Sequence, residues 1–171
     1  MKLTLSTVKS LIKRLKIYNG KYYLAEEINS ILFAKKEKKV KTPYTNLKEK
    51  CDDLWREIIK LKAGYCSEIS GKEGKQIGGE DVIAAHHIAG KKSLYLRYLI
   101  ENGICLINGS EHLYGIHSRN IIKANKYKDM IEEVKGVGIY ERLASYSNRK
   151  SKSLKEIEIY LEYELSKLKR S

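Results

Sequence analysis

A chain of 171 residues is long enough to form one domain with its own hydrophobic core. Its three cysteines, Cys51, Cys66 and Cys105, lie in no CxxC pair, so the sequence predicts neither a disulfide framework nor a four-cysteine zinc site and favours a reducing, cytoplasmic setting. The formal net charge of +13 suits a polyanionic partner, either nucleic acid or an acidic membrane face.

The positive charge is concentrated in the two flanks of the chain. Residues 1–50 carry 13 basic and 4 acidic side chains, residues 51–110 carry 8 of each, and residues 111–171 carry 13 and 9. Lysine-rich flanks can also serve solubility alone, because net charge does not identify a partner. Lysines interrupt every apolar run near the N-terminus, so we expect no export signal, no membrane span and no membrane partner.

The N-terminal part, residues 1–44, is predicted to be helical and basic. Apolar residues at helical spacing predict helices over residues 5–18 and 22–33, followed by a basic stretch and the only proline, Pro43. These helices form either an accessory DNA-binding module of the helix-turn-helix kind or a plain hairpin packed on the rest. A membrane-surface helix is the weaker third alternative, because the apolar stripe is short.

The clearest helix comes next. Apolar residues recur at helical spacing from Leu47 to Leu61, Thr45 or Asn46 is expected to cap the helix, and Gly64 is expected to end it. The glycine- and lysine-rich segment that follows predicts a loop or a loose hairpin.

Two short strands and further helices are predicted for the remainder. EDVIAAHHI indicates a strand, LYLRYLI fits a helix or a strand, and NGICLI indicates a second strand after an Asn-Gly turn. Residues 110–135 are predicted to form one helix capped by Ser110, followed by a short helix over residues 139–147. A capping box from Ser153 to Glu156 opens the last helix. The expected fold class is α+β, mostly helical.

All four histidines fall within residues 86–117. Because neighbouring strand residues face opposite ways, His86 and His87 cannot both address one atom. One can bind a metal ion while the other accepts a proton from water, which is the division of labour that metal-assisted hydrolysis needs. Folding the two strands onto the following helix brings His112 and His117 towards the same point.

Asn102 lies where the long loop after His87 closes onto the second strand, and its buried amide could bond the loop backbone and hold His87 still. The segments AHHIAGK, LRY, ENGICL and EHLYGIHS together resemble the ββα-metal motif of the HNH endonucleases. In that motif a His-His pair is followed by an asparagine and by one or two histidines in a helix. The neighbouring helices resemble those of phage HNH proteins of the NinG type, so the similarity covers residues 45–171.

The resemblance implies a metal-dependent endonuclease that hydrolyses the phosphodiester bonds of DNA. It implies a catalytic pair, with His87 as the general base and Asn102 as the loop-orienting residue. It implies three metal ligands, His86, His112 and His117. One divalent ion is expected, Mg²⁺ or Mn²⁺, although histidine-rich sites also accept Zn²⁺ or Ni²⁺.

The same resemblance implies how the chain is organised. The nuclease core would span residues 45–126, with the N-terminal module on one side and C-terminal helices, residues 127–171, packed on the core. It also implies an intracellular protein encoded by a phage or a mobile element. The oligomeric state and the DNA preference are left open, a homodimer included.

The spacing of the two helix histidines does not fit one face of a regular α-helix. His112 and His117 are five residues apart, and a regular α-helix places such residues about 140° from each other. Either His112 precedes the helix, or Gly115 marks a local bulge, or only one of the two histidines binds the metal.

Four basic residues near the histidines are predicted to contact phosphates: Lys91, Lys92, Arg97 and Arg119. The two lysines fit a solvated loop equally well, whereas Arg97 stands between apolar residues and needs a partner. Two other functions stay open: a non-catalytic DNA-binding protein with a structural metal, and a recombination nuclease that cuts branched DNA such as Holliday junctions or flaps.

Overall fold

The computed structural model describes residues 4–9, 41–75 and 81–170. The chain divides into two compact units, Met1–Val40 and Lys41–Ser171. The second unit is α+β and mostly helical, with one two-stranded antiparallel sheet, as the sequence predicts. None of the helices that the structure describes is both long and apolar enough to cross a membrane.

The first unit is described only in part. Residues 5–9 are helical, in agreement with the start of the first predicted helix. The rest of that helix, the second predicted helix and most of the basic stretch lie outside the described residues. The unit boundary falls after Val40, and Thr42 and Pro43 begin the first helix of the second unit.

Helix α3, Pro43–Lys62, has a different cap from the one expected. The Thr42 hydroxyl accepts a hydrogen bond from the Thr45 N–H at 3.2 Å. Pro43 takes the first helical position, where its missing N–H would have no partner anyway. Thr45 and Asn46, predicted as caps, therefore lie inside the helix. One face of α3 buries Cys51, Trp55, Ile58 and Ile59.

Both predicted strands are confirmed. Strand β1, Ile83–His87, pairs antiparallel with β2, Gly103–Ile107. The chain between them forms a short helix, α4, Leu94–Tyr98, and a 3-10 turn, η1, Ile100–Asn102. The ambiguous segment LYLRYLI is therefore mainly helical.

The predicted Asn-Gly turn is wrong. Gly103 has an extended backbone with φ of −104°, and it opens β2 rather than reversing the chain. The glycine is needed for packing, because a Cβ there would lie 2.2 Å from Ile59 Cδ1 and 3.0 Å from Trp55 Cζ2. Gly103 thus lets α3 approach the end of the sheet closely.

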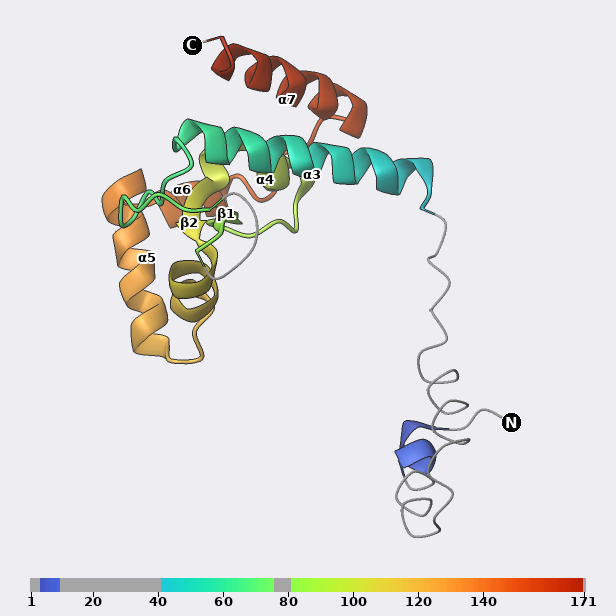
Figure 1. The fold of residues 1–171 in the computed structure, drawn as a ribbon. Coiled ribbons are helices and arrows are strands. Elements are labelled where there is room, and N and C mark those ends of the chain that lie inside the picture. Colours follow the sequence, from blue (N-terminus) through green and yellow to red (C-terminus); the bar gives the residue numbers. More distant parts are fainter. Residues whose placement is uncertain (1–3, 10–40, 76–80, 171) are drawn as a thin grey trace. The chain divides into compact units, whose positions relative to one another are not determined.

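Both faces of the sheet are buried: α3 lies over one of them (Figure 1), and the other packs on residues that include parts of α5, Ile121–Lys135, and of α6, Ile139–Ser145. One cluster of buried residues joins Ile83, Cys105 and Ile107 to α3 and to α7, Leu154–Leu168. The other cluster joins the opposite face of the sheet and the residue after β1 to α4, α5 and α6; its residues are Ile88, Leu96, Ile104, Leu106, Ile131, Ile139 and Leu143. The alternation of strand side chains therefore feeds two separate cores.

The single helix predicted over residues 110–135 is wrong. The chain forms a π-helix, η2, Asn108–Ile116, and then a separate helix, α5, Ile121–Lys135. The two helices fold back on each other so closely that a Cβ at Gly115 would lie 2.8 Å from the Tyr127 ring. Asn120 caps α5 by accepting a hydrogen bond from the Lys123 N–H.

The last two helices agree with prediction. Helix α6 spans Ile139–Ser145. The predicted capping box is present, since the Ser153 hydroxyl and the Glu156 carboxylate each bond the backbone N–H of the other residue. Helix α7 lies along α3, on the side of α3 away from the sheet in Figure 1.

Candidate active site

The pleat of β1 sends its two histidines to opposite faces of the sheet. His87 pairs with Gly103, on the face that packs against α3, and its ring stacks on Trp55 with a centroid distance of 3.9 Å and an interplanar angle of 5°. His86 pairs with Ile104 on the other face, beside η2. The predicted separation of the two imidazoles is therefore present.

Three imidazoles gather on the η2 side of the sheet. The ring centroid of His86 lies 4.9 Å from that of His112 and 5.2 Å from that of His117, and the latter two are 4.9 Å apart. One ring nitrogen of each lies within 4.8 Å of the other two. Two nitrogens that bind one tetrahedral zinc ion, each at about 2.0–2.1 Å, lie about 3.3 Å apart, so the three rings would have to move slightly closer to share an ion.

The π-helix accounts for the five-residue spacing. In this helix each N–H bonds the carbonyl five residues earlier, so residues five apart lie one above the other. The His117 N–H donates to the His112 carbonyl at 3.1 Å. Of the three alternatives left open by the sequence, a bulge is the one observed, and it extends over the whole of η2 rather than Gly115 alone.

Two of these imidazoles are held neutral. Burial, and to a smaller extent the nearby His112, His117 and His87, together lower the pKa of His86 to about 3. Burial also lowers the pKa of His112, with His117 acting in the same direction. Metal ions bind neutral imidazole, so at neutral pH these rings need lose no proton before they bind an ion.

A neighbouring amide sets the tautomer of His112. The Oδ1 atom of Asn108 lies 3.1 Å from His112 Nδ1. An amide oxygen only accepts hydrogen bonds, so Nδ1 carries the proton and Nε2 is left as the ligand atom. Such outer contacts orient metal-binding histidines in many proteins.

His87 is also held in one tautomer. Its Nε2 lies 2.9 Å from the carbonyl oxygen of Arg97, which can only accept, so Nε2 carries the proton and Nδ1 holds the lone pair. No hydrogen bond of the described residues uses Nδ1, and none of their buried side-chain nitrogens lacks a partner. His87 Nδ1 is therefore not fully buried, and its lone pair keeps some contact with solvent.

The surroundings of His87 favour its neutral form. Burial lowers the pKa of His87, and the positive charges of Lys91 and Arg97 act in the same direction. The hydrogen bond to the Arg97 carbonyl and the charge of Asp52 oppose them without reversing the shift. A neutral imidazole with a free lone pair can accept a proton at neutral pH.

Asn102 is fully buried and clamps the loop between the strands. Its Oδ1 accepts from the Ala89 N–H at 2.8 Å, and its Nδ2 donates to the carbonyls of Gly90 at 2.9 Å and Leu96 at 2.8 Å. Leu96 directly precedes Arg97, whose carbonyl oxygen accepts the hydrogen bond from His87. These contacts match the loop-orienting position predicted for Asn102, whose part in catalysis stays a prediction.

Arg97, predicted to contact phosphate, forms an ion pair within the protein. Its guanidinium forms a two-pronged pair with the Asp52 carboxylate on α3, with Nε to Oδ1 at 2.6 Å and Nη2 to Oδ2 at 2.5 Å. Two of its donors are thus used inside the protein, and contact of Arg97 with a phosphate stays a prediction. Because the pair docks α4 on α3, it positions the Arg97 carbonyl that holds His87.

Asp52 should therefore support stability above the acid range. Burial raises its pKa, but hydrogen bonding to Arg97 and the charge of Arg97 outweigh burial, and the net pKa is lowered. We expect Asp52→Ala to lower the free energy of unfolding at pH 7 by about 1.5–3 kcal/mol, measured by urea denaturation.

The same carboxylate gives a pH test with a matched control. A carboxylate with a lowered pKa stabilises the fold above its unfolded pKa of about 3.9, and this contribution is lost as pH falls through the folded value. The difference between wild type and Asp52→Ala should therefore shrink towards pH 2. Asp53→Ala, next door and exposed, should change stability by no more than about 0.5 kcal/mol. Equal effects of both variants would contradict this role of Asp52.

The other predicted phosphate contacts lie on the surface. Lys91 and Lys92 are exposed in the loop after β1, and Arg119 is exposed in the turn between η2 and α5. Lys91 lies close enough to His87 to affect its pKa. Contact of these side chains with DNA stays a prediction.

Four residues that support the candidate site were missed from the sequence: Asp52, Trp55, Asn108 and Glu111. Glu111 is buried and its Oε2 accepts from the Ser67 hydroxyl at 2.6 Å and from the Ile107 N–H at 2.8 Å, which ties η2 to the end of β2. Asn108 precedes His112 by one turn, a spacing that could have indicated the contact. Asp52 and Trp55 reach the site only through tertiary packing.

Comparisons of the chain with protein-family models, with curated proteins and with solved structures find no match. What the site can do is therefore inferred from its own side chains. These are three imidazoles with converging nitrogens, a fourth imidazole with a fixed tautomer, and an asparagine that clamps the loop between them.

Proposed function

We propose that this protein is a metal-dependent DNA endonuclease of the HNH type. The single observation that carries the proposal is the difference between the four histidines: three converge on one point, while the fourth is oriented by a carbonyl and keeps its lone pair in some contact with solvent. A site that only holds a structural metal has no use for the fourth. The basic character of the chain supports a nucleic-acid substrate.

His87 is the proposed general base. Its Nδ1 accepts a proton from a water molecule, while the Arg97 carbonyl accepts the Nε2–H and stabilises the imidazolium that forms. Trp55 stacks on the ring and fixes its plane, and Asn102 fixes the loop that carries the carbonyl. The geometry of the base is thus prepared before DNA binds.

His86, His112 and His117 are the proposed ligands of one divalent ion. Bound there, it would supply Lewis-acid stabilisation of the charge on the phosphate and on the departing 3′ oxygen. The described residues add no carboxylate to this group. Imidazole suits Zn²⁺ and Ni²⁺, whereas Mg²⁺ and Mn²⁺ prefer oxygen ligands. The all-imidazole donor set therefore favours Zn²⁺ or Ni²⁺ over the Mg²⁺ or Mn²⁺ expected from the resemblance.

A panel of DNA substrates tests the proposal. Linear and supercoiled duplexes, flaps and four-way junctions are incubated with purified protein after EDTA treatment and addition of Zn²⁺, Ni²⁺, Mn²⁺ or Mg²⁺. We expect cleavage with at least one transition-metal ion and none with EDTA. Preferential cutting of flaps or junctions would favour a branched-DNA recombination nuclease. Absence of cleavage on every substrate with every ion would contradict the enzyme and favour the non-catalytic DNA-binding alternative.

A further inference from the structure

The first turn of α5 exposes two adjacent isoleucines. Ile121 is 75% exposed and Ile122 is 83% exposed. His117, a proposed metal ligand, caps the end of η2, and the two isoleucines follow it after a short turn. The pair therefore lies close to His117 in the chain. The buried residue of α5 is Ile131, nearer the other end of the helix. The pair therefore contributes little to the core of the described unit.

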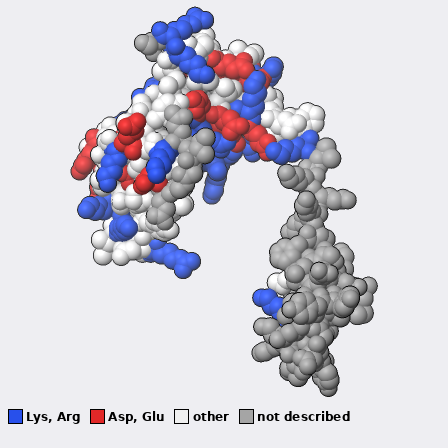
Figure 2. All heavy atoms as spheres, in the orientation of Figure 1, with Lys and Arg blue, Asp and Glu red and all other residues white. Residues whose placement is uncertain are grey.

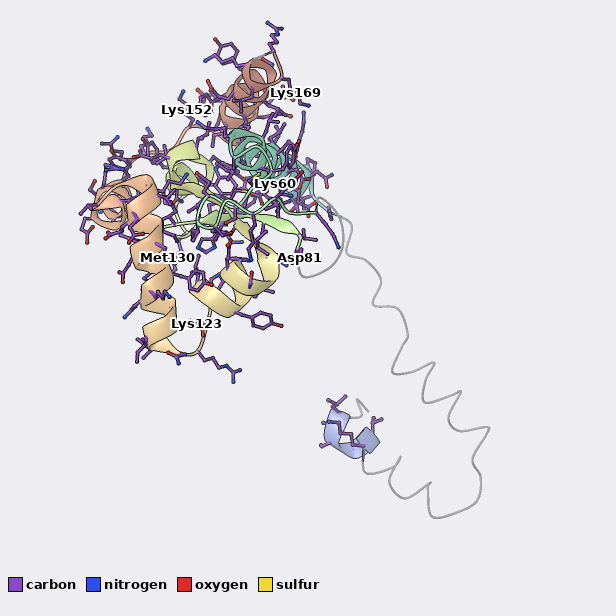
Figure 3. All side chains as sticks on the ribbon, turned by 60° about the vertical axis from the view of Figure 1, so that its left-hand side comes forward. Lys60, Asp81, Lys123, Met130, Lys152 and Lys169 are labelled. Carbon is purple, nitrogen blue, oxygen red and sulfur yellow. The ribbon has the colours of Figure 1, made fainter. Side chains whose placement is uncertain are left out.

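Positive charge surrounds this apolar pair. Arg119, Lys123 and Lys126 are all exposed, and the sequence holds no acidic residue between Glu111, which is buried, and Asp129. Figure 2 shows basic and uncharged surface, but no acidic surface, at the lower end of this unit in the view drawn. Figure 3 places Lys123 at the start of α5, beside η2, and Met130 further along the helix.

A partner of this surface has to satisfy both features. Contiguous exposed apolar surface with a polar rim is typical of interaction sites. Phosphates match the three cations, but they leave the isoleucines in water. DNA offers both chemistries, because its base faces are apolar and lie between two phosphate strands. Apolar side chains such as isoleucine insert between neighbouring bases in many proteins that bend or unstack DNA.

We propose that Ile121 and Ile122 form a wedge that inserts between neighbouring bases of the DNA, beside the bond that is cut. Arg119, Lys123 and Lys126 then bind the phosphates on either side. This inference rests on the proposed nuclease function and adds that the substrate is unstacked where it is cut. Steps that unstack easily, such as TA and CA, are bound best at the wedge.

Fluorescence of 2-aminopurine tests the wedge without any cleavage. The base is placed at successive positions of a duplex, and its fluorescence is read as protein is added in EDTA, with affinity measured by anisotropy of an end label. Wild type should raise the fluorescence at one or two positions, because unstacking relieves quenching. The double variant Ile121→Ser/Ile122→Ser should lose this rise and bind roughly tenfold or more weakly.

Val137→Ser is the matched control. Val137 is 88% exposed in the turn after α5, so its replacement removes a similar exposed apolar side chain elsewhere. It should leave both signals unchanged, and circular dichroism should show all variants folded. The wedge is overturned if the fluorescence rise survives in the double variant or is absent from wild type. It is also overturned if wild type is a dimer that the double variant dissociates, since the pair then covers a second copy.

The two proposals can fail separately. Cleavage of DNA without any 2-aminopurine response removes the wedge and leaves the nuclease. A response that depends on Ile121 and Ile122, without cleavage on any substrate, leaves the wedge in a DNA-binding protein and removes the nuclease.

Discussion

Replacement of His87 by alanine should lower the rate of DNA cleavage by about 10²- to 10⁴-fold, the usual contribution of a general base. The reason is the lone pair on Nδ1, which keeps some contact with solvent while Nε2 is held by the Arg97 carbonyl. His87 points to the α3 face, away from the three converging imidazoles, so the variant should keep its metal affinity. Single-turnover cleavage with saturating protein measures the loss in the chemical step.

His87→Gln separates the base from the scaffold. A glutamine amide can still donate a hydrogen bond to the Arg97 carbonyl, but it has no lone pair basic enough to accept a proton. It should therefore be nearly as inactive as His87→Ala, with a melting temperature closer to that of wild type. Cleavage within tenfold of wild type by either folded variant would remove His87 from the role of base.

The strands and their alternation were predictable because they depend on local pattern. The β-branched run before His86 and the run after Asn102 gave both strands, and the two-residue pleat then required His86 and His87 to diverge. The capping box at Ser153 was equally local, since its partners are three residues apart. Each of these features is decided by neighbours in sequence.

The failures arise where distant packing overrides local preference. The segment around Gly115 has helical character throughout, yet contact with Tyr127 folds it back on α5, and η2 takes π-helical hydrogen bonding. Gly103 was predicted as a turn residue, but it is needed because α3 leaves no room for a side chain. Periodicity carries no information on such contacts.

Arg97 shows what residue chemistry can and cannot predict. An arginine among apolar residues needs a partner, and this expectation was correct. The partner, Asp52, lies on another helix and was not identifiable from spacing. The pair fixes the Arg97 carbonyl that orients His87, while contact of Arg97 with DNA stays a prediction.

The three converging imidazoles should bind one transition-metal ion and stabilise the fold when they do. Titration of a protein without a polyhistidine tag should show one Zn²⁺ or Ni²⁺ per chain by calorimetry. Metal at one hundred times Kd should stabilise the fold by about 2.7 kcal/mol, roughly 5–10 °C in Tm. His86→Ala and His112→Ala should abolish this shift, because each removes one of three converging ligands.

The fourth histidine and Asn108 make the test specific. His87→Ala removes an imidazole of the same strand and should leave metal binding unchanged. A loss of metal binding in this variant would indicate non-specific binding to histidine. Asn108→Ala keeps all ligands but frees the tautomer of His112, and should weaken binding by about 10- to 100-fold. A shift that persists in His86→Ala and His112→Ala would place the ion elsewhere. The hydrogen bond from His112 Nδ1 to the Asn108 amide fixes the lone pair on His112 Nε2. An unchanged metal affinity in Asn108→Ala would therefore mean that this amide does not orient His112.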